Sequence, residues 1–486
     1  MANFTILVLY VISLTVILLF SVGQAFLIYF YLKSKKTNSL ELKLPENLPI
    51  ITIQLPLFNE LYVTERLINS VCNLNYPNNK LEIQVLDDSN DQSLALTSTL
   101  ISEKVALGFD IQHIKRGKNI GFKAGALQYG LTKAKGEFIA IFDADFLPES
   151  EFLMQLLPYF STDNIGMVQS RWGHINNDFS LLTKVQGFGL DGHFTIEQTG
   201  RNSAHLFMNF NGTAGIWRKR CIEDAGGWQH DTLTEDLDLS YRAQLKGWDF
   251  KYAEEITTPA ELPVELNSFK SQQHRWTKGA VETSKKMITS VWKTDIGLKR
   301  KIFASLHLLN SYAFLFIFLT CVLSIPVLFI KNNTYIPAIY FQFLSIYVIG
   351  FLIVTLFYLI ASFSKRKDYG SFIKLFPMFL SVSMALSFHN SIAVLEGVFN
   401  FKSDFIRTPK FNVITVGDSF KNNIYLKHKL PVSFYADLFL CFYFLLGIAG
   451  AFYYKDFGLL PFHLMLFIGF CVLNFYSLKS HFISSH

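Results

Sequence analysis

Two pairs of aspartates are the residues in this chain best suited to chemistry. Asp87 and Asp88 follow one short β-rich run, and Asp143 and Asp145 follow another in the sequence FDADF. The Asp-x-Asp spacing puts two carboxylates on one side of an extended segment, where they offer hard oxygen ligands to Mg²⁺ or Mn²⁺. A divalent ion held there would bridge a diphosphate and neutralise the charge that develops as the diphosphate leaves. Each aspartate taken alone fits a helix cap or an Asx turn equally well.

Two further polar motifs follow along the chain. Thr234-Glu235-Asp236 lies in an acidic stretch, where one carboxylate could act as a general base on an incoming hydroxyl. The alternative is a helix start, with a threonine cap and acidic residues in the first turn. The sequence 272–276 (QQHRW) combines a guanidinium suited to phosphate oxygens with an indole on which a sugar ring can stack. Its alternative is a basic and aromatic membrane anchor.

The elements that would position these residues alternate between strand and helix. Helical stretches such as 60–74 and 121–135 lie between the β-rich runs, which are 50–56, 82–87, 110–115, 138–143 and 165–170. This alternation predicts βαβ units and an α/β fold with a mainly parallel sheet. Ligands of such sheets bind beyond the carboxyl ends of strands, which is where both aspartate pairs stand.

Composition separates this α/β part from a membrane part. Half of the 486 residues are hydrophobic and 17% are charged, against roughly 25% in soluble domains. No Asp or Glu occurs in residues 1–40 and only six occur beyond residue 300, so residues 41–300 form the water-soluble part. The net charge of +6 comes from Lys and Arg that bracket apolar runs without forming a basic stripe, which argues against a nucleic-acid partner. The five scattered cysteines support neither a disulfide framework nor a zinc site.

Five membrane-spanning helices are expected. The apolar run 4–32 is long enough to cross a bilayer, and the lysines that follow it place the next residues in the cytoplasm. Further spans are expected at about 303–330, 336–363, 433–453 and 457–479. The run 371–398 is expected to lie in the membrane interface instead, because spanning would put the basic residues of 402–429 outside the cell.

The ordered set of motifs resembles a known family. The two acidic sites, the TED motif and the QxxRW motif, followed by apolar helices, are similar to the membrane-embedded family 2 glycosyltransferases, which include the cellulose, hyaluronan and mannan synthases. The resemblance is closest to the plant mannan-synthase-like branch and its bacterial relatives. It rests on PLFNE (56–60), KAGAL (123–127), VQSRWGHIN (168–176), the DGHF and EQ elements around 191–198, and FNGTAG (210–215).

The resemblance implies a GT-A (Rossmann-like) catalytic domain joined to an α-helical transmembrane region. The implied division is an N-terminal transmembrane anchor (1–33), a cytoplasmic GT-A domain (45–290), a juxtamembrane interface (291–302), two transmembrane helices (303–363), an interfacial amphipathic helix (371–400), a gating-loop-like segment (401–415) and two more transmembrane helices (433–479).

The resemblance also implies a role for each matched residue. The donor's base and ribose would be held by Phe58, Glu60, Asp87 and Asp88, and its diphosphate would be approached by Lys123. The metal, Mg²⁺ or Mn²⁺, would be bound by Asp145 directly and served by Asp143. The catalytic group would comprise Asp236 as base, its neighbour Glu235, and Arg275, which would stabilise the leaving diphosphate. The acceptor sugar would be bound by Asn211, Gly212, Thr213, Gln272 and Trp276.

The sequence FIRTPK at 405–410 is similar to the FxVTxK gating loop of cellulose synthase. The matched residues are Phe405, Arg407, Thr408 and Lys410, with Arg in place of Val and an added Pro. Such a loop must be cytoplasmic, which agrees with the side count that placed 371–398 in the interface. The alternative is a basic loop that lies against anionic headgroups.

The expected function is transfer of a hexose from a nucleotide-sugar of UDP-glucose or GDP-mannose type to a growing β-linked polysaccharide. The transfer would be inverting and would take place at the cytoplasmic face of the inner membrane. One alternative is a ceramide or diacylglycerol glucosyltransferase, which adds a single sugar to a lipid acceptor. Another is a non-catalytic nucleotide-sugar-binding export component. No in-chain RxxxR second-messenger domain is expected, so regulation would be simpler or come from an export or regulatory partner.

Overall fold

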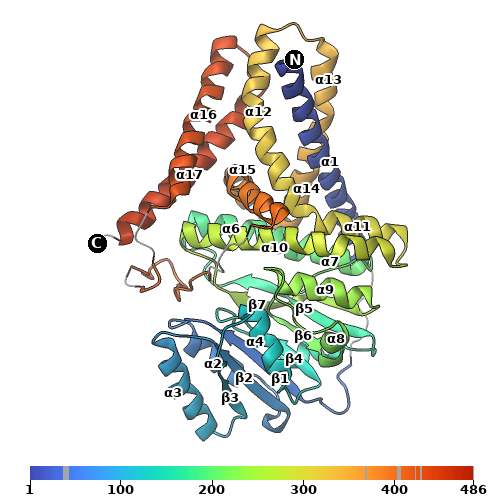
Figure 1. Ribbon diagram of the computed structural model, residues 1–486, viewed down its shortest axis with the longest axis vertical. Coiled ribbons are helices and arrows are strands. Elements are labelled where there is room, and N and C mark those ends of the chain that lie inside the picture. The colour runs from blue at the N-terminus through green and yellow to red at the C-terminus, as the bar shows by residue number, and fades with distance from the viewer. Residues whose placement is uncertain (37–42, 367–368, 402–406, 422, 427–429, 485–486) are drawn as a thin grey trace.

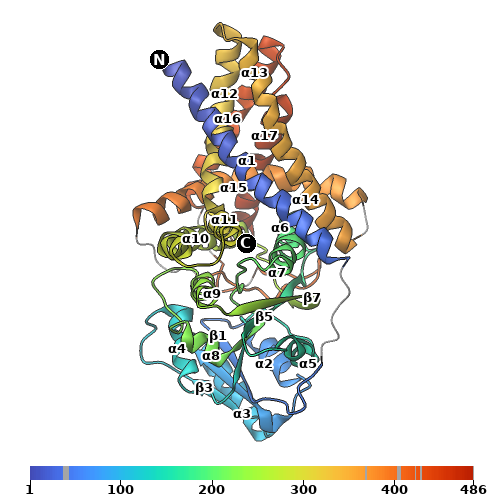
Figure 2. The same cartoon turned by 90° about the vertical axis from the view of Figure 1, so that its right-hand side faces the viewer.

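The computed structural model describes residues 1–36, 43–366, 369–401, 407–421, 423–426 and 430–484. A sheet with its covering helices forms one end of the molecule, and long helices form the other (Figure 1). The helices α6 (Leu181–Gly192), α10 (Leu266–Lys293) and α11 (Leu298–Leu308) lie between these two parts (Figures 1 and 2).

The described residues form one seven-stranded sheet in the order β3-β2-β1-β4-β6-β5-β7. Its strands are β1 (Ile51–Leu57), β2 (Leu81–Asp87), β3 (Ile111–Ile114), β4 (Phe138–Ile141), β5 (Ile165–His174), β6 (Gly215–Arg218) and β7 (Asp249–Ala260). All neighbouring strands pair in parallel except β6, which is antiparallel to both β4 and β5. The predicted α/β class with a mainly parallel sheet is confirmed.

Helices cover both faces of the sheet, so its central strands are buried on both sides. One core packs β1 and β2 against α2 (Thr64–Cys72), and the other packs α4 (Phe122–Leu131) and α9 (Glu235–Leu245) against the opposite face. The remaining elements of this part are η1 (Asn78–Lys80), α3 (Ser93–Ala106), α5 (Phe152–Leu156), η2 (Leu157–Tyr159), the π-helix η3 (His193–Glu197), α7 (Gln198–Ser203) and α8 (Lys219–Asp224).

Six helices in the described part of the chain are long and apolar enough to cross a membrane. The helical elements of this region are α1 (Ala2–Ser34), η4 (Asn310–Tyr312), α12 (Ala313–Asn333), α13 (Ala338–Leu344), η5 (Ser345–Tyr347), α14 (Val348–Arg366), α15 (Tyr369–Phe399), α16 (Val432–Tyr454) and α17 (Leu460–Ser484). Five of the six apolar segments match the predicted spans, and the sixth is α15.

The direction of α15 differs from that of the other apolar helices. It is seen nearly end-on in Figure 1 and runs crosswise to α12 and α17 in Figure 2, next to α10. The helix α15 has 31 residues and is long and apolar enough to cross a membrane, yet it lies along the boundary between the two parts. This direction fits the interfacial placement expected for 371–398, and the count of five spans stays a prediction.

Candidate active site

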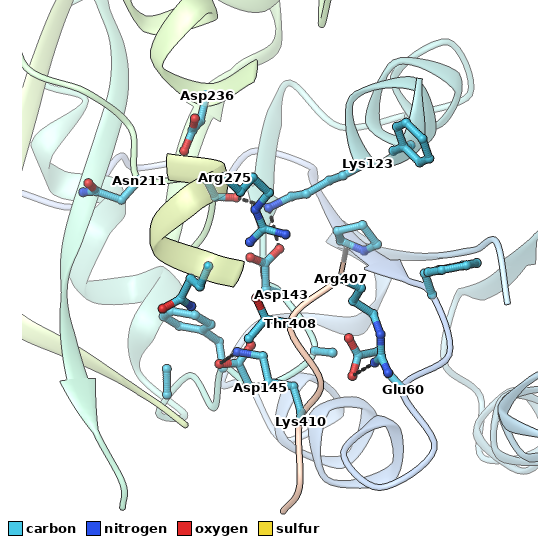
Figure 3. A pocket seen from close by; sticks show the side chains of 18 of the residues that line it. Glu60, Lys123, Asp143, Asp145, Asn211, Asp236, Arg275, Arg407, Thr408 and Lys410 are labelled. Atoms are coloured by element: carbon cyan, nitrogen blue, oxygen red, sulfur yellow. Dashed lines mark hydrogen bonds and ion pairs between the residues drawn. The ribbon is translucent and has the colours of Figure 1, made fainter. Parts of the chain in front are cut away.

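A pocket of about 230 Å³ opens between the carboxyl ends of the central strands and α10. It gathers predicted site residues from eight separate stretches of the described chain. The predicted site residues that line it are Phe58, Glu60, Asp88, Lys123, Asp143, Asp145, Asn211, Gly212, Glu235, Asp236, Gln272, Arg275, Trp276, Arg407, Thr408 and Lys410. Figure 3 shows ten of these residues around Asp143.

Two of the predicted site residues that the structure describes, Asp87 and Thr213, do not line the pocket. Asp87 is buried behind it, where Oδ2 lies 2.9 Å from His113 Nε2 and Oδ1 accepts a hydrogen bond from the Ser89 amide. Burial raises the pKa of Asp87, but these hydrogen bonds outweigh it and hold the pKa below its ordinary value. Thr213 is fully buried, and its Oγ1 accepts from the Asp143 amide. Phe405 lies outside the described residues.

The two candidate metal carboxylates each meet an ammonium group. Asp143 Oδ1 lies 2.6 Å from Lys123 Nζ, and Asp145 Oδ2 lies 2.7 Å from Lys410 Nζ. These contacts show that positive charge is stable beside both carboxylates. No group of three His, Cys, Asp or Glu side chains that could hold a metal occurs among the residues described. Asp143 and Asp145 would therefore supply two carboxylates to a divalent ion, and its remaining oxygen ligands would have to come from outside these side chains.

Asp236 stands in the first turn of α9, in a crowded and half-buried position. Its Oδ1 accepts from the Leu237 amide, and its Oδ2 would lie only 3.0 Å from a Cβ built on Gly212. Gly212 also has φ +81°, so both its conformation and this close approach require glycine. Burial and the neighbouring Glu235 raise the pKa of Asp236 to about 7, against the opposing charge of Lys123. A carboxylate with such a pKa is suited to act as a general base at neutral pH.

The alternative interpretation of 234–236 as the start of a helix is also confirmed, since α9 begins at Glu235 with Thr234 as its N-cap. Thr234 makes no side-chain capping bond, and its Oγ1 instead lies 3.0 Å from Thr283 Oγ1 of α10. This contact ties the helix that carries Asp236 to the helix that carries Arg275 and Trp276.

One face of α10 forms the membrane-side wall of the pocket. Gln272, Arg275 and Trp276 are spaced at i, i+3 and i+4, so their side chains lie on the same face of this helix. Figure 3 shows Arg275 and Lys123 reaching toward Asp143 from different elements. Two cations thus converge on the acidic end of the pocket, where a diphosphate would place its negative charge.

Asn211 contributes to the wall, although Figure 3 shows its side chain turned away from Asp143. Its Oδ1 accepts from Asn209 Nδ2 at 2.8 Å and lies 3.2 Å from His193 Nε2. The other nitrogen of His193 lies 2.9 Å from Glu197 Oε2. The π-helix that carries His193 and Glu197 therefore contacts and stabilises the 209–213 loop.

The segment 407–413 lies over the part of the pocket that Glu60 and Asp145 line. Arg407 pairs with Glu60 at 2.7 Å, and burial raises the pKa of Glu60 to about 7 in spite of that partner. The backbone amides of Phe411 and Asn412 donate to Glu261, which also pairs with Arg66 at 2.8 Å. This segment therefore contacts the α/β part through both its side chains and its backbone.

Glu261 and Trp172 line the pocket but are absent from the residues singled out above for catalysis or binding. Glu261 directly follows β7, which was not predicted as a strand. Trp172 lies two residues beyond the predicted run 165–170, because β5 continues to His174. The rule that residues just beyond strand ends are candidates would have found Glu261, had the end of β7 been known, but not Trp172, which lies within β5.

Comparison with known proteins agrees with this geometry. Residues 49–279 match the sequence family described as "Glycosyltransferase like family 2". Glucomannan 4-beta-mannosyltransferase 2 of Arabidopsis thaliana is 38% identical over 313 residues, which are 60% of this chain and 58% of that protein. Probable glucomannan 4-beta-mannosyltransferase 4 of Oryza sativa subsp. japonica is 41% identical over 271 residues, covering 55% and 49%. The chain thus spans about half the length of these relatives.

A solved structure shares the fold. The mannosyltransferase PcManGT from Pyrobaculum calidifontis, in complex with GDP-Man and Mn²⁺, superposes with a TM-score of 0.56 at 16% sequence identity. The match covers 82% of this chain and the whole of that one. The expected GT-A fold is therefore confirmed for the α/β part.

Proposed function

Because residues 49–279 belong to the glycosyltransferase-like family 2, we propose that this chain is a membrane-embedded hexosyltransferase. It transfers a hexose from a nucleotide-sugar of UDP-glucose or GDP-mannose type to a growing β-linked polysaccharide. The observation that carries the proposal is the convergence of Asp143, Asp145 and Asp236 with Lys123 and Arg275 on one pocket. The names of the plant relatives and of the mannosyltransferase bound to GDP-Man support a hexose donor of this class.

The proposed step is a single displacement with inversion. The acceptor hydroxyl oxygen forms a bond to the anomeric carbon of the donor hexose, and Asp236 takes the hydroxyl proton. The bond between that carbon and the diphosphate oxygen breaks, and the nucleoside diphosphate leaves with the electron pair. Arg275 and Lys123 stabilise the departing charge. A divalent ion held by Asp143 and Asp145 would supply further positive charge to the diphosphate.

The reaction would take place at the cytoplasmic face of the inner membrane. The lysines that follow α1 and the basic residues of 407–421 favour the cytoplasmic side for the segments that adjoin the pocket. Five helices would cross the bilayer, with α15 in the interface. The bilayer itself is then a partner, together with the nucleotide-sugar donor and the glycan acceptor.

The test is a donor screen with purified protein in membranes. Membranes are incubated with UDP-glucose, GDP-mannose and related donors with Mg²⁺ or Mn²⁺, and release of UDP or GDP is followed. We expect turnover with one hexose donor and a product of polymer size. If the product is a glycolipid that carries a single sugar, the polysaccharide proposal is wrong. If no donor leads to release of UDP or GDP, the proposed hexosyltransferase activity is refuted.

Asp236→Asn tests the base within the same screen. We expect loss of turnover with donor binding retained, because the amide cannot accept the proton but keeps the shape of the side chain. The matched control is Asp231→Asn, an exposed acid in the same loop that pairs with Lys286. Full activity in Asp236→Asn would remove Asp236 from the mechanism.

A further inference from the structure

Trp172 is a second indole in the pocket wall, on β5 rather than on α10. Its ring centroid lies 6.4 Å from that of Trp276, and the two ring planes are inclined by 54°. Both indoles line the same cavity. Trp276 was expected to bind the acceptor sugar, whereas Trp172 had no expected role.

The position of Trp172 is fixed by its surroundings. Phe146 packs edge-on against it with centroids 5.1 Å apart, and Phe194 lies at 5.0 Å. The backbone of Trp172 pairs with Thr258 of β7, and its neighbour Arg171 lies 3.5 Å from Asp191. Because these contacts hold the indole from several sides, it offers a preformed surface, and little conformational freedom is lost when something binds to it.

Trp172 also stands on the reaction side of the pocket. Phe146, against which it packs, directly follows the metal candidate Asp145, and Trp276 directly follows Arg275. The residues proposed for the donor's base and ribose that also line the pocket, among them Phe58 and Asp88, are different ones. Trp172 therefore lies where an acceptor would be held, not where the base of the donor would lie.

A purely structural role is the competing explanation, since Trp172 borders both hydrophobic cores of the α/β part. Trp217 shows what such a role looks like in this chain, because it is completely buried in one core. Trp172 instead keeps part of its surface exposed to the cavity. An indole left partly open beside a second indole suits an apolar surface that enters the pocket, and the C–H face of a pyranose is such a surface.

The separation and inclination of the two rings bear on what is bound. Two planes inclined by 54° cannot both lie flat against one face of a single pyranose. The two indoles therefore present two separate stacking surfaces, each suited to one sugar unit. We propose that Trp172 is a second acceptor-stacking residue, which together with Trp276 makes a chain of at least two linked hexose units the preferred acceptor.

This inference rests on the proposed hexosyltransferase function and deepens it. It predicts that the enzyme extends an existing oligosaccharide better than it glycosylates a single sugar. The probes are soluble β-linked manno- and gluco-oligosaccharides of one to six units, supplied with the active donor to the membrane-bound full chain. Transfer rates give KM and kcat for each acceptor length.

The variants are Trp172→Ala and Trp172→Phe, with Trp248→Ala as the matched control. Trp248 is also a partly buried tryptophan that borders a core, but its Nε1 donates to Asp224 and it does not line the pocket. For Trp172→Ala we expect acceptor KM to rise about threefold to tenfold for chains of two or more units, as loss of one aromatic contact implies. The rise in KM should be larger for these chains than for a single sugar or for the donor.

The phenylalanine variant should restore most of the affinity for longer acceptors, because it keeps a flat ring. The proposal is overturned if Trp172→Ala raises KM equally for one and two units, raises donor KM to the same extent, or loses donor hydrolysis, since each of these indicates a structural role. It is overturned as well if Trp172→Ala behaves like Trp248→Ala. Absence of transfer by the unmodified protein would instead refute the hexosyltransferase function, and this inference with it.

Discussion

Asp236 combines burial, a like charge on Glu235 and a pKa of about 7. Below that pH the carboxyl is protonated and cannot take a proton, so the raised pKa predicts loss of activity on the acid side. With donor and metal saturating, we expect turnover to fall about tenfold per pH unit below about pH 7. A pH profile of nucleoside diphosphate release measures this directly.

Glu235→Gln changes the same profile in a defined direction. Removing the like charge lowers the pKa of Asp236, so the acid limb should move to lower pH while the maximum rate is largely kept. The control Asp231→Asn, at an exposed position, should leave the acid limb of the pH profile at the same pH. An unmoved limb in Glu235→Gln would show that another group controls it.

Lys410 places an ammonium group 2.7 Å from Asp145 Oδ2, where the charge of a metal ion is expected. The ion must displace Lys410 before it can use that oxygen. Lys410→Gln should therefore bind Mn²⁺ about tenfold more tightly in the absence of donor, as measured by electron paramagnetic resonance of free Mn²⁺. The control is Lys421→Gln, which changes an exposed lysine in the described stretch 407–421. Equal affinity for Mn²⁺ in the two variants would contradict competition between Lys410 and the ion.

The candidate carboxylates could be found from the sequence because their signal is local. Asp143 and Asp145 follow a recognisable strand, and two polar residues at one strand end suffice to mark a site. The partners of these residues could not be found in this way. Lys410 meets Asp145 across 265 residues of sequence separation, and Arg407 meets Glu60 only because the segment 407–413 lies over the pocket.

At the scale of elements, the buried ion pair between Lys270 of α10 and Asp437 of α16 joins the pocket wall to the apolar helices. Its two atoms are 2.5 Å apart and both side chains are at most 4% exposed. Removing one charge leaves the other buried without a partner. Asp437→Leu should lower the free energy of unfolding by about 3 kcal/mol or more.

The double variant Lys270→Met with Asp437→Leu separates this charge effect from loss of packing. It should recover most of the lost stability, because no unpaired charge remains. Asp110→Asn, which breaks the exposed pair with Lys135, should change stability by less than about 1 kcal/mol. Thermal unfolding in detergent compares the four proteins, and a double variant as unstable as Asp437→Leu would argue against the charge explanation.

Strand prediction succeeded where the local pattern was strong and failed where tertiary pairing decides. The five predicted runs are all strands. β6 has only four residues, and β7 carries charged residues along its length (DFKYAEEITTPA), so neither has a clear hydrophobic signal. Both are held by their neighbours: β6 lies between β4 and β5, and β7 pairs along almost all of β5.

At the scale of the whole molecule, the direction of α15 determines on which side the later segments lie. The N-terminus and the turns after α12 and α16 lie at the end away from the sheet (Figures 1 and 2). If α15 lies in the interface, residue 421 is cytoplasmic and residue 457 is external. If α15 crosses the bilayer, these two sides are exchanged, whereas residue 335 is external in both cases.

Labelling of single cysteines with a membrane-impermeant maleimide distinguishes these arrangements. In sealed right-side-out vesicles, Tyr335→Cys and Phe457→Cys should react, because both positions are exposed, while Lys421→Cys should react only after permeabilisation. Four of the native cysteines are buried and Cys471 is partly buried, so unmodified protein gives the background. Reaction at 421 with protection at 457 would mean that α15 spans the membrane. The segment 407–421 would then lie across the bilayer from the side assigned to the donor, and the catalytic geometry around Lys410 and Asp145 would have to be abandoned.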